Sequence, residues 1–248
     1  MGNAAIWIVG LGAAGLVFWL AERRRKGPRR KREAALQAVA SRLGFTYAPE
    51  GDPYRQEPFL EQHITDASDP LRQGFYGFPH FLRGQCAAGP ITIFDIWHGG
   101  PGHHDASKPY KATMAGFRLS GAALPPLHIE PEDKNDRFSN AVFKPVHAAT
   151  GWGDIDFDDD PAFSDRYALH SGDETATRAL FSPAFRAFWN SLPTESRLGA
   201  AANGETLVVY REPAFRQGRE GALQPDAYDA FIHEAEMIVS AFRQALVR

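Results

Sequence analysis

Three histidines and a carboxylate in one short segment are the first residues whose types could support chemistry. His98, His103, His104 and Asp105 lie within a run that also holds three glycines and a proline. Imidazole and carboxylate groups are ligands that zinc accepts, so a metal-assisted enzyme that uses these histidines is one interpretation. However, their spacing matches no established motif, and ordering a glycine-rich loop costs roughly 1–2 kcal/mol per residue. We therefore favour a solvated hairpin loop over a metal site.

The acidic stretch from Asp154 to Asp160 is the second candidate for metal chemistry. Counted from Asp154, aspartates occupy positions 1, 3, 5 and 12 of a potential calcium loop, but position 6 is Asp159, where such a loop requires glycine. Ile155 and Phe157 alternate with the acids, which is typical of a half-buried strand with its carboxylates in solvent. The structural interpretation is preferred, and metal binding by either segment stays open.

A glycine pattern near the N-terminus suggests nucleotide binding. The run Gly10-Leu11-Gly12-Ala13-Ala14-Gly15 matches G-x-G-x-x-G, which needs a preceding strand and a second strand that ends in an acid about 20 residues later. Glu33 is at nearly that distance, but the intervening residues are rich in Arg and Lys and are interrupted by Pro28. We predict no nicotinamide or flavin cofactor, and we assign no catalytic residue.

The residues around this pattern fit a membrane span better. Residues 4–21 carry no charged side chain, and as a helix they would extend about 27 Å, close to the roughly 30 Å hydrocarbon core of a bilayer. Trp7 and Trp19 lie near the two ends, where aromatic rings prefer the interface. The sequence therefore predicts a transmembrane helix over 4–21, preceded by an extracytoplasmic stub over 1–3.

A strongly basic linker follows over residues 22–33. Its eight cations stand after the apolar stretch, whereas a cleaved signal peptide carries them before it, and they place the N-terminus outside and the body in the cytoplasm. The rest of the chain holds 19 basic and 28 acidic residues, a net charge of −9, which argues against nucleic acid as a partner. The linker cations are also candidates for binding anionic lipid: Arg23, Arg24, Arg25, Lys26, Arg29, Arg30, Lys31 and Arg32.

Residues 34–248 are predicted to form a cytoplasmic α+β domain. Hairpins and helices follow one another without regular strand–helix–strand alternation, which favours a mainly antiparallel sheet covered by helices on one face. The one cysteine, Cys86, excludes an intramolecular disulfide framework. The expected helices cover 31–43 and 225–247, and a further helix begins near Asp173 and restarts at Ser182-Pro183, with Ser182 as the cap, to run to Leu192. The other expected elements are hairpins over 80–97 and 198–210 and strands over 45–47, 111–119, 127–130 and 167–170, with residues 48–79 as a loop.

Several phrases of the body resemble an uncharacterised group of bacterial single-pass membrane-anchored proteins. The resemblance covers most of residues 30–247 and implies a bacterial inner-membrane context, but no activity, cofactor or site residue. The phrases that carry it are Asp154-Ile155-Asp156-Phe157, Pro161-Ala162-Phe163-Ser164, Tyr167-Ala168-Leu169, Asp173-Glu174, Leu43-Gly44-Phe45 and Ile93-Phe94-Asp95.

These observations favour a membrane-anchored cytoplasmic domain that binds an unknown protein partner and catalyses no reaction. The alternative is a metal-assisted enzyme that uses His98, His103 and His104. A nucleotide-binding oxidoreductase is the third interpretation.

Overall fold

A ten-stranded sheet in which all strand pairs are antiparallel dominates the described part of the chain. The computed structural model describes residues 30–50, 75–77, 79–98, 110–132, 152–211 and 223–247. The strand order is β1-β3-β4-β5-β10-β9-β6-β8-β7, and β2 pairs with β4. The strands are β1 (Thr46–Glu50), β2 (Phe75–Gly77), β3 (Pro79–Cys86), β4 (Gly89–His98), β5 (Tyr110–Arg118), β6 (Leu124–Pro131), β7 (Gly153–Asp154), β8 (Tyr167–Ser171), β9 (Leu198–Gly204) and β10 (Thr206–Arg211).

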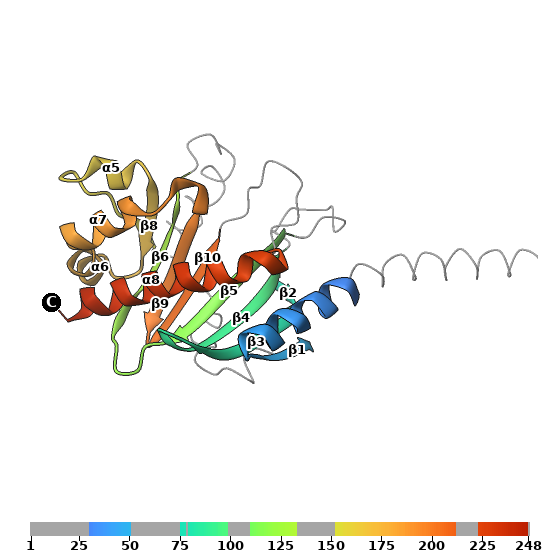
Figure 1. Ribbon diagram of the computed structural model, residues 1–248. Helices are drawn as coiled ribbons and strands as arrows, with labels where there is room; N and C mark the ends of the chain where they lie inside the picture. The colour runs from blue at the N-terminus through green and yellow to red at the C-terminus, as the bar shows by residue number, and fades with distance from the viewer. Residues whose placement is uncertain are drawn as a thin grey trace, which may run out of the picture.

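The described helices lie on one face of this sheet (Figure 1). A helix covers residues 30–43, and we call it the N-terminal helix. The long C-terminal helix crosses the middle strands, and three shorter helices cover the end of the sheet near β8. They are α5 (Pro161–Ser164), α6 (Glu174–Leu180), α7 (Pro183–Ser191) and α8 (Tyr228–Leu246).

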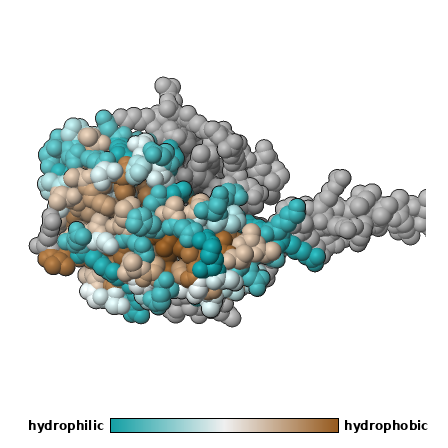
Figure 2. Space-filling view, viewed as in Figure 1, coloured by the Kyte–Doolittle hydropathy of each residue, from teal (hydrophilic) through white to brown (hydrophobic). Residues whose placement is uncertain are grey.

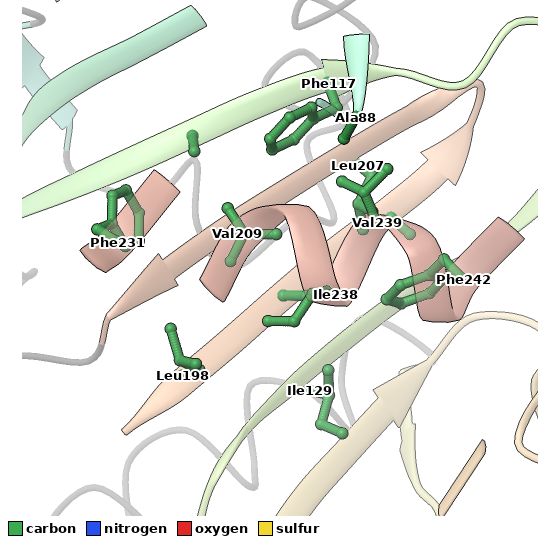
Figure 3. Close-up of a cluster of buried hydrophobic side chains, with 14 of the residues drawn as sticks. Ala88, Phe117, Ile129, Leu198, Leu207, Val209, Phe231, Ile238, Val239 and Phe242 are labelled. Atoms are coloured by element: carbon green, nitrogen blue, oxygen red, sulfur yellow. The ribbon is translucent and has the colours of Figure 1, made fainter. Parts of the chain in front are cut away.

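The core lies between α8 and the sheet. Side chains alternate between the two faces of a strand, so every second residue of the middle strands points toward the helices. Phe231, Ile238, Val239 and Phe242 of α8 meet this set of strand residues (Figure 3), and each of the four is fully buried. At the end near β8, the ring of Phe242 also makes an edge-on contact with Phe185 of α7, with ring centroids 5.0 Å apart.

The structure confirms the predicted α+β fold and most of its elements. Both predicted hairpins form, as β3–β4 and β9–β10, and Gly204 adopts the positive φ of 57° that the second turn requires. The strand β2 lies inside the segment that was predicted to be a loop, because three residues paired with the end of β4 leave no periodic signal. Asp173 caps α6 by accepting a hydrogen bond from Ala176, whereas the side chain of Ser182, the predicted cap of α7, makes no such bond.

The predicted membrane span over 4–21 lies outside the described residues. Within the described ranges, no helix is both long enough and apolar enough to cross a membrane.

Candidate functional site

The buried carboxylate of Asp95, in β4 beside the start of the N-terminal helix, is the centre of the best-defined polar site. Asp95 of β4 and Thr113 of β5 are register partners on the helix-covered face of the sheet, and each residue is 1% exposed. The Thr113 hydroxyl donates to Asp95 Oδ1 at 2.6 Å. Arg32 donates to Asp95 Oδ2 from Nη2 at 2.7 Å and from Nε at 3.1 Å. This charge-assisted pair holds the N-terminal helix against the sheet.

The same residues also fix the chain where it enters α8. Arg32 Nη1 donates to the carbonyl of Leu223 at 3.0 Å, and the backbone N–H of Leu223 donates to Thr113 Oγ1 at 2.9 Å. We call Arg32, Asp95, Thr113 and Leu223 the Asp95 junction. It joins the N-terminal helix, the paired strands β4 and β5, and the chain that leads into α8.

Tyr228, the first residue of α8, lies beside this junction. Its side chain is fully buried, and among the described residues its hydroxyl makes no well-formed hydrogen bond. Burial, and then the negative charge of Asp95, raises the pKa of the Tyr228 hydroxyl, so this group stays neutral. The hydroxyl keeps its proton, and Arg32 and Thr113 already bind the two oxygens of the Asp95 carboxylate, so the arrangement is a structural one.

Arg32 was predicted to be one of eight cations available to anionic lipid. The structure gives it an intramolecular partner instead, and its side chain is only 20% exposed. Arg30 and Lys31 precede it in the same helix and are exposed. Of the three linker cations that the structure describes, two are therefore exposed to solvent and the third is bound within the fold.

A second polar cluster lies on the opposite face of the sheet. The register places Asp154 of β7, His170 of β8 and His128 of β6 side by side on adjacent strands. His170 Nδ1 lies 4.0 Å from Asp154 Oδ1, and His128 Nε2 shares a hydrogen bond with the Tyr210 hydroxyl. Both histidines are buried. We call these four residues the His128 row.

Gly199 leaves the space that the Tyr210 ring needs to reach His128. Tyr210 is paired with Gly199 on β9, and its ring crosses that strand to contact His128 on β6 beyond it. A Cβ at Gly199 would lie 2.5 Å from Tyr210 Cζ, which is too close for any side chain. The hydroxyl of Tyr210 also donates to the carbonyl of Ile129 at 3.3 Å. The cluster is therefore packed into the sheet as a unit.

The acidic stretch behaves as the structural interpretation predicts. Ile155 and Phe157 are buried, whereas Asp154, Asp156 and Asp158 are exposed. The β-ladder is shorter than expected, because only Gly153 and Asp154 pair with β8.

Two carboxylates of this stretch bind an arginine of α7. Arg186, itself 4% exposed, forms ion pairs with Asp159 at 2.6 Å and with Asp160 at 3.1 Å. Its guanidinium also stacks on the ring of Phe157, 4.2 Å from the centroid. These carboxylates therefore neutralise a buried cation of the fold.

The histidine segment of the alternative, metal-assisted interpretation lies mostly outside the described residues. His98 is the last residue of β4 and pairs through its backbone with Tyr110 and Phe75. His103 and His104 lie outside the described residues. Among the residues that the structure describes, no three His, Cys, Asp or Glu side chains are grouped so that they could hold a metal ion.

Sequence reasoning missed the Asp95 junction, although a signal was present. Asp95 follows Ile91 and Ile93 at every second position of β4, so it interrupts the row of apolar residues that faces the helices. A buried carboxylate on such a face requires a partner. The sequence alone does not show that this partner is Arg32, which lies 63 residues away.

A shallow groove separates the N-terminal helix from the start of α8. Its volume is about 590 Å³, and Figure 2 shows apolar surface between these two helices. The ion pair between Arg42 and Asp229, at 2.6 Å, crosses the groove. The remaining lining residues are Ala35, Ala38, Val39, Pro225 and Asp226.

No family model matches the chain, and no curated protein matches it. The fold is similar to the crystal structure of the mycobacterial trehalose monomycolate transport factor A, TtfA, with a TM-score of 0.50 and 10% sequence identity. The alignment covers 85% of this chain and 94% of that chain. A likeness at this identity shows the fold alone: an α+β domain with a large antiparallel sheet covered by helices.

Proposed function

We propose that this protein is anchored in the bacterial inner membrane by residues 4–21 and acts by binding a protein partner in that membrane. Residues 1–3 lie outside, residues 22–33 form the basic linker, the last four residues of which belong to the N-terminal helix, and the folded body lies in the cytoplasm. On this proposal the body is an accessory factor and not an enzyme. It requires no cofactor.

One observation carries the proposal: an uncharged stretch of 18 residues is followed at once by eight cations. The length suits a bilayer, and the cations set the orientation. The Asp95 junction supports the same arrangement, because Arg32, at the end of the basic linker, is bonded directly to the sheet. The anchor is thus joined to a rigid part of the body.

The binding role has two supports. Two carboxylates of the acidic stretch serve the fold, since Arg186 forms ion pairs with Asp159 and Asp160. The similar fold of a protein named as a transport factor offers a precedent for a role in a membrane process. We therefore propose that the partner is a component of a membrane transport assembly.

The topology is tested with fusions to Arg248. Alkaline phosphatase placed there is expected to be inactive, and a cytoplasmic fluorescent protein bright, because the body stays inside. Replacement of the eight linker cations by Gln should weaken this orientation. Active phosphatase at Arg248 of the unaltered chain would refute the topology.

The binding role is tested by cross-linking and recovery from membranes, beside elemental analysis of the purified full chain. A partner recovered equally with the wild type and with the His103→Ala/His104→Ala variant supports binding. Stoichiometric zinc or nickel that this variant loses would favour the metal-assisted enzyme with His98, His103 and His104.

A further inference from the structure

The two ends of the sheet differ in what is attached to them. The Asp95 junction fixes the start of the N-terminal helix and the start of α8 near the end of β4. We call this the proximal end, and it includes the paired strand ends His98 and Tyr110. At the other end, Arg243 of α8 donates to the carbonyl of Ala88 in the β3–β4 turn at 2.8 Å.

The proposed anchor enters at the proximal end. Residues 22–29, which join the predicted span to Arg30, reach at most about 30 Å when fully extended. The 19 residues of α8 span a similar length, about 28 Å, from the proximal end toward the β3–β4 turn. The anchor alone therefore keeps the proximal end close to the bilayer but leaves the body free to tilt.

Electrostatic interactions with the membrane surface can restrict this tilt of the body. Arg30 and Lys31 are exposed at the start of the N-terminal helix, whereas Arg32 is neutralised by Asp95. An anionic membrane surface attracts each of these exposed cations. Residues 34–248 carry a net charge of −9 and are repelled. Attraction at one end and repulsion of the body act in the same rotational sense.

We infer that the proximal end of the sheet faces the cytoplasmic leaflet, with Arg30 and Lys31 in contact with anionic lipid headgroups. This inference rests on the proposed membrane anchor. It gives the body a fixed orientation, in which the β3–β4 turn and the end of α8 point away from the lipid. The Asp95 junction transmits the orientation, because it prevents the charged helix from separating from the sheet.

The test uses the full chain in nanodiscs. Each sample carries a single fluorophore, attached near one end of the sheet or near the other. In a Cys86→Ser background, the probe is attached at Gln224→Cys near the proximal end or at Ser120→Cys in the turn after β5. Both positions are exposed and uncharged in the native chain. The nanodiscs contain phosphatidylcholine with phosphatidylglycerol and a quencher on the lipid headgroups. The probe at 224 is expected to lose most of its fluorescence and the probe at 120 little.

Two double variants test whether the charges of Arg30 and Lys31 cause the difference in quenching between the two probes. Arg30→Gln with Lys31→Gln should reduce the difference between the probes toward the value in pure phosphatidylcholine, and only the part that is due to repulsion of the body should remain. Arg118→Gln with Arg178→Gln removes two exposed cations elsewhere on the body and should leave the difference unchanged. Equal quenching at both positions, or stronger quenching at 120, would overturn the inference.

Extraction of membranes with alkaline carbonate distinguishes a failure of the proposed anchor from a failure of the orientation inference. If alkaline carbonate releases the chain from native membranes, the proposed span is wrong and the orientation inference falls with it. If the chain resists extraction and the two probes are quenched equally, only the orientation inference fails.

Discussion

Buried polar side chains of this protein avoid an unpaired charge in different ways. Asp95 is paired with Arg32 and Thr113, whereas the hydroxyl of Tyr228 stays protonated because burial and the nearby carboxylate oppose its ionisation. Tyr167 provides a contrast, since its buried hydroxyl donates to the carbonyl of Trp189 at 2.9 Å. The two tyrosines therefore respond differently to loss of the hydroxyl group.

Tyr228→Phe should cost little stability at pH 7, because the native hydroxyl makes no well-formed bond among the described residues. Tyr167→Phe should cost about 1 kcal/mol, because it removes a made bond. The raised pKa of Tyr228 means that the native state keeps a proton that the unfolded chain loses above about pH 10. Stability therefore falls there by up to roughly 1.4 kcal/mol per pH unit, and Tyr228→Phe removes this loss. Urea denaturation at pH 7 and above pH 10 measures both effects.

Cys86 should react slowly with alkylating agents. Partial burial raises the pKa of its thiol, and the carboxylate of Glu236 raises it further. Glu236→Gln removes that negative charge and should speed the reaction of Cys86 with iodoacetamide at pH 8, whereas Glu205→Gln, at the surface pair with Arg118, should not. An unchanged rate in Glu236→Gln would show that burial alone protects the thiol.

At the scale of the elements, the N-terminal helix depends on one ion pair as well as on its apolar face. Leu36, Val39 and Ala40 pack into the core, and the predicted amphipathic pattern accounts for them. The contact of Arg32 with Asp95 adds a directional constraint, because a charged group in a buried site accepts few alternative positions. The two partners are unequal, since the side chain of Asp95 is 2% exposed and that of Arg32 20%.

This inequality predicts an asymmetric double-mutant cycle. Arg32→Ala leaves an uncompensated buried carboxylate and should cost about 3–5 kcal/mol. Asp95→Asn leaves a partly exposed cation and should cost less. The double variant should be more stable than the sum of the single effects implies. As a surface control, Arg118→Ala at Glu205 should change the free energy of unfolding by less than about 1 kcal/mol.

For the whole molecule, the folded unit extends into the segment that was predicted to be a linker. The predicted domain begins at residue 34, although the helix predicted over 31–43 already crosses that boundary. In the structure the N-terminal helix includes residues 30–33, and Arg32 is bonded to the sheet. The apolar helix face alone does not define where the body begins. The boundary depends on a contact between residues that are distant in the sequence.

A fragment of residues 30–248 should therefore be more stable than a fragment of residues 34–248. Thermal unfolding of the two purified fragments measures the difference, which should match the cost of Arg32→Ala. If 34–248 melts at the same temperature as 30–248, the junction contributes nothing to the body.

Local patterns in the sequence were sufficient for the fold class and for most elements. The Asn203-Gly204 turn and the apolar stripe of α8 depend on residues close to one another in the chain, so their physical causes can be recognised locally. The alternation of Ile155 and Phe157 with acids likewise predicted which side chains are buried. β2 was missed because its pairing with β4 is its main stabilising interaction.

The tertiary structure decided which charged residues meet. Arg32 looked like one of eight equivalent linker cations, and Asp95 like an irregularity in a strand, until folding brought them within 2.7 Å. His128, His170 and Asp154 became neighbours only through the strand order. Such contacts are specified by the register and by the packing of helices on the sheet, which sum over many distant residues, whereas periodicity and turn chemistry act within a few residues of the chain.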